Sequence, residues 1–164
     1  MWRILLLAAA LAAPGIAHAQ GRFTSPLGVY SFTAPNGWTP HTDLGGAHVL
    51  YKAPGGAVLF SGSAEVTHSL GAEMTAEIGA DALVERRAVT IDGMPCEFAS
   101  AIEDGVMRTS MLLCHFYVPY SDGEARIGFN LVLLSPVARA DRQLEIFWQV
   151  ANSIKWGGAY APAP

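Results

Sequence analysis

Alternating apolar and polar residues in the first part of the chain predict strands. Residues 30–33 alternate, and the residues that follow, Pro35-Asn36-Gly37, have strong turn chemistry. Residues 48–53 and 57–65 flank Pro54-Gly55-Gly56, where proline cannot donate to a ladder and glycine permits positive φ. We therefore expect one strand, a turn and then a hairpin.

The apolar spacing becomes helical from about residue 72 to residue 87. Met74, Ile78 and then Ala82 or Leu83 recur at intervals of three to five residues, which predicts a helix that Gly79 weakens. After it, Asp-Gly pairs at 92–93, 104–105 and 122–123 separate apolar stretches, and Asp-Gly suits tight hairpin turns. The second half is therefore predicted to be a meander of about four strands.

A helix is predicted at the C-terminal end. Ser135 can cap it and Pro136 suits its first position, because that position needs no N–H donor. An apolar stripe at spacings of three and four runs to about Trp156, and consists of Leu144, Phe147, Trp148, Ala151 and Ile154. The fold class expected is α+β: a mostly antiparallel sheet of about six to seven strands, flanked by helices that include this long C-terminal one.

The first nineteen residues have the order of a cleavable export signal. Arg3 precedes an apolar run from Ile4 to Ala13, and the small residues Ala17 and Ala19 fit a peptidase site. The run is about half of the roughly 20 apolar residues that span a bilayer. We expect a signal peptide at 1–19, one domain at 20–156 and a flexible tail at 157–164. The alternatives are an uncleaved anchor and a buried N-terminal helix.

Composition narrows the classes of partner. The chain is 51% hydrophobic and 15% charged, with a formal net charge of −4 and no dense Lys/Arg cluster, which argues against nucleic acid or an anionic membrane as partner. No cysteine lies near the expected cleavage site, so no lipid anchor is expected there. The expected location is the periplasm or the exterior of the cell.

Cys96 and Cys114 are the two cysteines of the chain, and the predicted hairpin brings them together. If Ile102 faces Arg108, facing residue numbers sum to 210, and this register sets Cys96 directly opposite Cys114. We predict a disulfide, which the export signal favours. The alternative is a pair of buried thiols that pack as small hydrophobes.

The sequence contains no recognisable catalytic or cofactor motif. The histidines after the leader are scattered singly, without the short spacings of a metal site, so no metal or cofactor is expected. Ser61, Ser63 and His68 suggest a serine hydrolase, but nothing in the sequence specifies a positioned base or an oxyanion site. These serines are interpreted as ordinary strand positions, and the protein is expected not to be an enzyme.

Aromatic residues are the remaining candidates for function. Trp38 lies in a turn beside Pro40, while Tyr117 and Tyr120 lie near a hairpin end, so these three form candidate partner-binding surfaces. The alternatives are that Trp38 closes one end of the core and that Tyr117 packs on the outer face of the sheet.

Two short motifs resemble the family of PsbP-like and DcrB-like domains. They are Tyr30-x-Phe32-x-x-Pro35-x-Gly37-Trp38 and Val89-x-Ile91-Asp92-Gly93-Met94-Pro95, and the segment from Phe147 to Lys155 is similar to that family's closing helix. The resemblance implies an antiparallel sheet flanked by helices, used by extracytoplasmic proteins as a non-enzymatic binding scaffold. The chain differs from the DcrB-like lipoproteins in lacking a lipidation cysteine.

The sequence thus predicts an exported binding or accessory protein that recognises a protein partner in the cell envelope. Two alternatives stay open: an immunity or inhibitor protein against an exported toxin, whose basic surface the acidic chain would suit, and a small envelope hydrolase with a dispersed Ser/His site.

Overall fold

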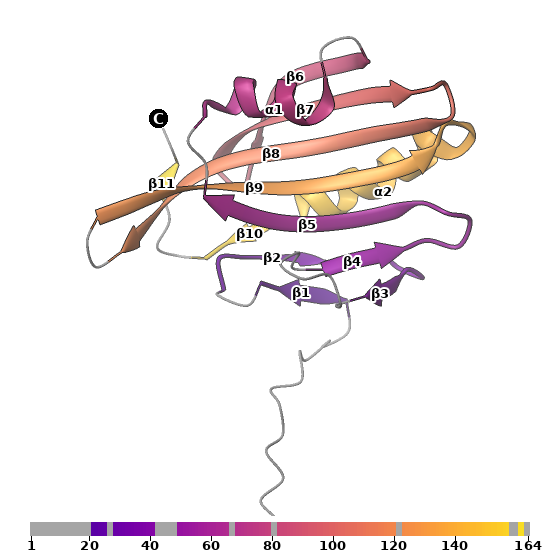
Figure 1. Ribbon diagram of the computed structural model, residues 1–164. Helices are drawn as coiled ribbons and strands as arrows, with labels where there is room; N and C mark the ends of the chain where they lie inside the picture. The colour runs from indigo at the N-terminus through magenta and orange to yellow at the C-terminus, as the bar shows by residue number, and fades with distance from the viewer. Residues whose placement is uncertain are drawn as a thin grey trace, which may run out of the picture.

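The computed structural model describes residues 21–25, 28–41, 49–65, 68–79, 82–120, 123–157 and 161–162. An antiparallel sheet of seven strands, in the order β3-β4-β5-β9-β8-β7-β6, forms the centre of this part of the chain (Figure 1). Its strands are β3 (Thr39–His41), β4 (Val49–Lys52), β5 (Val58–Glu65), β6 (Leu83–Ile91), β7 (Met94–Glu103), β8 (Met107–Tyr120) and β9 (Gly123–Pro136). The predicted α+β class and strand number are confirmed.

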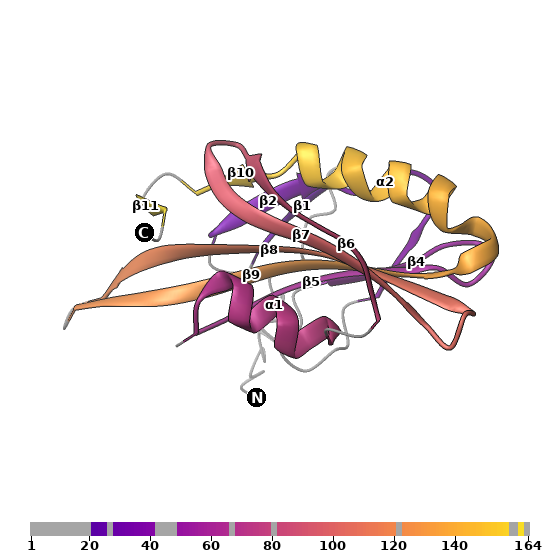
Figure 2. The same ribbon diagram turned by 90° about the horizontal axis from the view of Figure 1, so that it is seen from above.

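The two faces of this sheet carry different elements (Figure 2). On one face lie helix α2 (Ala140–Asn152) and a small antiparallel sheet of β1 (Arg22–Thr24), β2 (Tyr30–Thr33) and β10 (Lys155–Trp156). Helix α1 (Leu70–Ile78) covers part of the other face. The arrangement has three layers, with the long strands β8 and β9 running through the middle.

Strand alternation builds a separate apolar cluster on each face of the main sheet. The face toward α2 buries large side chains from its strands: Val49, Tyr51, Leu59, Phe98, Leu112, Phe116, Phe129, Leu131 and Leu133. Phe147, Val150 and Ile154 pack onto them from α2 and the residues after it. The opposite face buries fewer side chains, Ala99, Ala101, Met111, Leu113 and Val132, beneath Met74 and Ile78 of α1. The larger cluster therefore fixes the position of α2.

The predicted register of β7 and β8 is confirmed, since Phe98 pairs with Leu112 and Ser100 with Ser110. It places Cys96 opposite Cys114 with their Cα atoms 4.2 Å apart, and the two residues form the predicted disulfide. Both cysteines are buried in the larger apolar cluster. The bond therefore joins the strands from inside the core.

The helix predicted over residues 72–87 is shorter in the structure. The Ser69 hydroxyl caps α1 by accepting from the Ala72 N–H, and Gly79, with φ of 79°, ends it. The predicted second half is instead the strand β6, which pairs with β7 along most of its length. The helical spacing gave a wrong prediction because β6 is the edge strand among the described residues and exposes most of its side chains, so its apolar positions do not alternate.

The C-terminal helix also differs from its prediction at both ends. Strand β9 continues through Ser135 and Pro136, and the 3₁₀ turn η1 (Val137–Arg139) leads into α2, so Ser135 does not cap the helix. The helix ends at Asn152 rather than near Trp156, because Lys155 and Trp156 pair with β2. The Trp156 indole N–H donates to the Ile91 carbonyl at 2.7 Å, which ties β10 to the end of β6.

Predictions for the ends of the chain fall mostly outside the described residues. Residues 1–19, the predicted signal peptide, lie outside the described residues. Within the predicted tail, β11 (Ala161–Pro162) pairs with Tyr117 and Phe116 of β8, and the flexibility of the tail stays a prediction. Among the described residues, no helix has the length and apolarity that crossing a bilayer requires.

Replacing both cysteines by alanine is expected to lower the free energy of unfolding by about 3 kcal/mol. The reason is that the disulfide closes a loop with a sequence separation of 18 residues, which restricts the unfolded chain. Urea unfolding of the wild type and the double variant, each with and without reductant, measures the difference. An unfolding midpoint of the wild type that is insensitive to reductant would contradict the prediction.

Candidate binding cleft

The structure places the predicted aromatic residues at opposite ends of the main sheet. Trp38 lies at the end where β4 turns into β5 and where η1 begins, whereas Tyr117 lies near the far end of β8. Strand β8 has 14 residues, so its ends are about 40 Å apart at about 3.3 Å per residue. Tyr117 is partly buried, and the side chain of Tyr120 lies outside the described part. The aromatic residues therefore belong to two separate surfaces.

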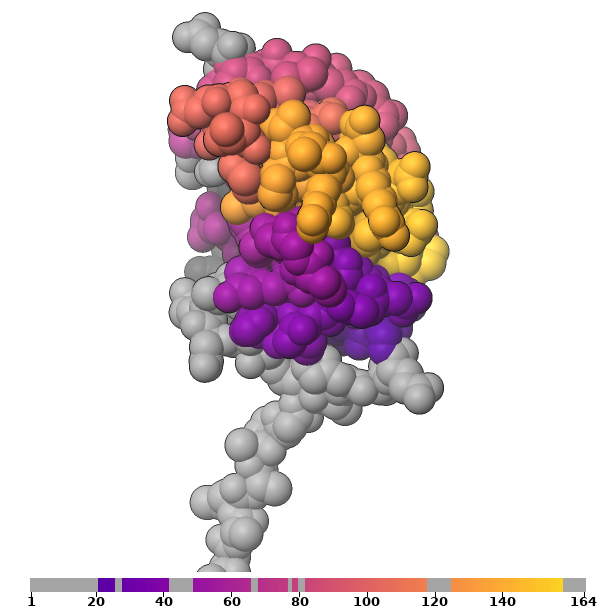
Figure 3. Space-filling model, turned by 90° about the vertical axis from the view of Figure 1, so that its right-hand side faces the viewer, coloured from indigo at the N-terminus to yellow at the C-terminus, as the bar shows by residue number. Residues whose placement is uncertain are grey.

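A cleft of about 620 Å³ lies beside Trp38. Residues 36–38 and the β4–β5 turn form one side, and η1 with the first turns of α2 forms the other. Figure 3 views this end of the molecule, with the start of α2 in orange above the purple β4–β5 turn. A second hollow of about 250 Å³ continues along α2 and shares Asn36 and Ile146 with the first. Together they make an elongated depression along one side of α2.

Local backbone chemistry shapes the first side of the cleft. Gly37 adopts φ of 76° in a turn where the Trp38 N–H donates to the Pro35 carbonyl at 3.3 Å. Trp38 is 9% exposed, so its ring packs into the apolar cluster while it also lines the cleft. This position agrees with the expectation that Trp38 closes one end of the core, and its role in partner binding stays a prediction.

Gly55 allows the two sides of the cleft to meet. The Arg139 Nη1 donates to the Gly55 carbonyl at 3.3 Å, and a Cβ at Gly55 would lie 1.6 Å from that nitrogen. Gly55 also has φ of 100°, which L residues with side chains rarely adopt. The glycine therefore fixes the Arg139 guanidinium over the β4–β5 turn.

The polar groups of the cleft are cationic or without a partner. Arg142 is exposed and forms no hydrogen bond or ion pair within the described part of the chain, and no Asp or Glu lines the cleft. Gln143 is 8% exposed, and its Oε1 is buried without a hydrogen-bond donor among the described residues. A buried acceptor with no donor costs free energy, which a donor from a bound molecule would recover.

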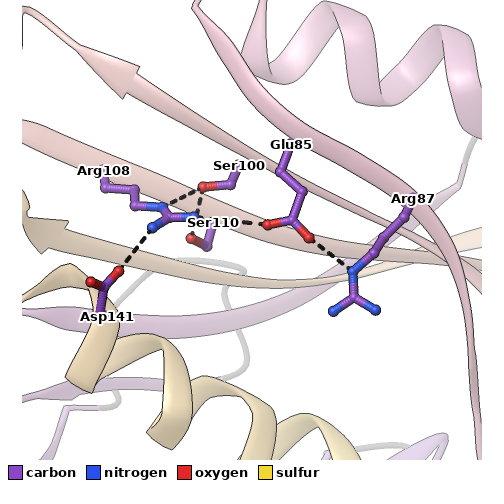
Figure 4. Close-up of polar contacts among 6 residues, drawn as sticks. All are labelled: Glu85, Arg87, Ser100, Arg108, Ser110 and Asp141. Atoms are coloured by element: carbon purple, nitrogen blue, oxygen red, sulfur yellow. Dashed lines mark hydrogen bonds and ion pairs between the residues drawn. The ribbon is translucent and has the colours of Figure 1, made fainter.

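A polar network connects the first turn of α2 to the sheet (Figure 4). The Arg108 Nε donates to the Ser100 Oγ at 2.7 Å, and its Nη1 lies 3.4 Å from the Asp141 Oδ1. The Arg108 side chain is 14% exposed and also lies near Glu85, whose partner is Arg87. Asp141 is thereby drawn toward Arg108, and it is not among the residues that line the cleft.

The structure separates Ser61 from the buried histidine His115. Ser61 is fully buried on the face toward the small sheet, with its Oγ 3.0 Å from the Tyr30 hydroxyl, and burial raises the pKa of that tyrosine. His115 lies on the opposite face, its Nε2 2.5 Å from the Glu73 Oε2 of α1. Ser63 is partly buried on β5, and the His68 carbonyl accepts from Arg126. Ser61 therefore lacks the solvent access that a nucleophile needs.

Sequence reasoning found Trp38 but missed the residues opposite it. Arg139, Arg142 and Gln143 fall within a segment interpreted only as the start of an amphipathic helix. The available signal was the pair of arginines three positions apart, which a helix places on one side. Within the described residues, no group of three or more His, Cys, Asp or Glu side chains gathers as metal ligands.

Comparison with known proteins identifies the fold. No protein-family profile matches the chain, and no curated protein sequence matches it. Its structure is similar to the solution structure of cyanobacterial PsbP (CyanoP) from Synechocystis sp. PCC 6803, with 16% sequence identity and a TM-score of 0.59. The match covers 91% of this chain and 100% of that one. The fold is PsbP-like, which confirms the resemblance noted in the sequence motifs, and at this identity the match concerns the fold alone.

Tyr51, which lines a hollow beside Trp38, is expected to tolerate loss of its hydroxyl. That hydroxyl is buried with no hydrogen-bond partner in the described part of the chain, so Tyr51→Phe should leave the free energy of unfolding unchanged or raise it. Tyr30→Phe should lower it by about 1 kcal/mol, because it removes the contact with Ser61. Urea unfolding of the two variants at pH 7 measures both effects, and an equal loss in the two would contradict the assignment.

The pH dependence of the same variants provides a second measurement. Burial raises the pKa of Tyr51 to about 12 in the folded protein, whereas an unfolded tyrosine ionises near 10. The stability that the neutral phenol contributes is therefore complete below pH 10 and is lost as the pH rises toward 12. Tyr51→Phe is expected to reduce this alkaline loss, measured as unfolding free energy from pH 9 to 12.

Proposed function

We propose that this protein is an exported, non-enzymatic accessory protein that binds a protein partner through the end of the molecule that carries the cleft beside Trp38. The cleft carries the proposal, since it combines an apolar wall, two arginine side chains and a buried acceptor without a donor. Convergent polar groups in an otherwise apolar hollow are typical of a binding site. The PsbP-like fold supports an accessory role, because the resemblance implies a binding scaffold.

Exposed apolar side chains beside η1 favour a protein partner over a small molecule. Val106, in the β7–β8 turn, is 64% exposed, and Val137 is 37% exposed. The Val137 N–H donates to the Val106 carbonyl at 3.0 Å, so the two residues are adjacent. Since Val137 and Arg139 share the η1 turn, the apolar surface extends the cleft end beyond the cleft itself. Tyr117 and Tyr120 form a second candidate surface at the other end.

The two alternative functions, a toxin inhibitor and a hydrolase, have less support from the structure. An inhibitor of a basic toxin would present acidic groups, whereas the cleft is lined by arginines and by no carboxylate. A hydrolase built on Ser61 would need that serine exposed beside a base, and it is buried against Tyr30.

Site-specific photo-crosslinking in cells tests the proposed surface. A photo-reactive amino acid at Val137 or Arg142 is expected to give a discrete protein adduct, which mass spectrometry then identifies. The matched control is the same amino acid at Thr90, an exposed position of β6 outside the cleft end. Adducts of equal yield at all three positions, or none at Val137 and Arg142, would refute the proposal.

Export is tested by the intact mass of the protein isolated from cells. We propose that residues 1–19 are removed, so the expected chain begins at Gln20 and appears in the periplasm or the medium. The disulfide supports this location, because such bonds form and persist in oxidising compartments. A chain that retains Met1 would show instead that the leader is kept, as an anchor or as part of the fold.

A further inference from the structure

We propose that the cleft beside Trp38 binds an extended acidic segment of the partner protein. In this complex a carboxylate of the segment pairs with Arg139 and Arg142, and a backbone N–H of the segment donates to the Gln143 Oε1. The inference rests on the proposed function and specifies the chemistry of the ligand.

The charges at the cleft define the first requirement. The Arg139 guanidinium has a carbonyl partner, Gly55, and Arg142 has no partner in the described part of the chain. The nearby acid Asp141 pairs with Arg108 and does not line the cleft. Because no carboxylate lines the cleft, the positive charge of the two guanidinium groups is available to a bound anion. The two N–H groups at the end of an arginine side chain match the two oxygens of a carboxylate.

Gln143 defines the second requirement. The residue is more than nine-tenths buried and lines the cleft, and its buried side-chain oxygen lacks a donor within the described residues. An anion such as sulfate offers no N–H or O–H to this oxygen, so it would satisfy the arginines alone. A peptide supplies both groups, because every residue other than proline carries an N–H and an acidic residue adds the carboxylate.

The shape of the depression defines the third requirement. The hollow continues from Trp38 past Ile146 to Gln149 and Val150, along one flank of α2. Its volume of about 620 Å³, with about 250 Å³ more along the helix, lies in the range of sites that enclose short ligands. Pro54 and Ile146 add apolar wall beside Trp38, so an apolar residue next to the acidic one fits the segment.

Titration of the full, isotope-labelled protein, as isolated from cells, tests this ligand chemistry by nuclear magnetic resonance. The probe is a capped hexapeptide with two leucines and two glutamates, and the comparison peptides carry glutamine or lysine in place of glutamate. We expect the acidic peptide to shift the side-chain signals of Trp38, Arg142 and Gln143, and to bind about tenfold more tightly than the glutamine peptide.

Variants of the two polar groups separate binding from structural support. Arg142→Gln should lower the affinity for the acidic peptide about tenfold, and Arg142→Glu should make the protein prefer the lysine peptide. Gln143→Met keeps the side-chain volume, and it should lower the affinity for every peptide that retains the backbone N–H. Arg86→Gln, a matched change on the opposite face of the sheet where Arg86 pairs with Glu97, should leave affinity unchanged, and a dispersed spectrum of each variant confirms folding.

The outcomes distinguish this inference from the function on which it rests. Equal affinity for the acidic and glutamine peptides, an Arg142→Glu variant that keeps its preference, or sulfate that shifts the Gln143 signals as strongly as the peptide would each overturn the acidic-segment proposal. Crosslinks at Val137 and Arg142 would in that case still support a protein partner at this end. Peptide binding without any crosslink in cells would overturn the proposed function instead.

Discussion

The register of the β7–β8–β9 meander is the constraint on which the rest of the structure depends. Asp104 and Gly105, with φ of 49° and 69°, form the tight turn that sets Ser100 opposite Ser110 and Cys96 opposite Cys114. A slip of one residue would exchange the faces of a strand, and the aromatic side chains of the core would point toward α1 instead of α2. The disulfide removes that freedom, because it joins the two strands seven residue pairs away from Glu103 and Met107, the pair nearest the turn.

The position of α2 follows from this register, and the cleft follows from α2. The Phe98 ring lies 5.8 Å from that of Phe147 and 4.8 Å from that of Trp148, so the middle of the helix is fixed by aromatic packing. Its first turn has polar contacts instead, through Arg108 and Asp141. Since Asp141 is fully exposed, the ion pair adds little to stability, and Asp141 does not line the cleft.

Features encoded by neighbouring residues were predictable, whereas those encoded by contacts between distant segments were not. The Asp-Gly turns, the hairpins and the cysteine register depend on local turn chemistry and on period-two alternation. Residues 83–91 form a strand because they pair with the edge of β7. Trp156 lies outside the helix because it pairs with β2. The cleft was the least predictable feature, since residues 36–38, the β4–β5 turn and the η1–α2 junction are far apart in sequence.

The contrast between an acidic chain and a cationic cleft limits how a partner can be recognised. The formal net charge of −4 opposes the approach of a broadly acidic surface, and salt at physiological concentration screens this repulsion and the attraction of the two arginines alike beyond about 8 Å. Attraction therefore acts only on a carboxylate that reaches the mouth of the cleft. A projecting acidic segment meets this condition because it brings few charges close at once, whereas a flat acidic face does not. The charge pattern thus selects for the shape of the partner as well as for its sign.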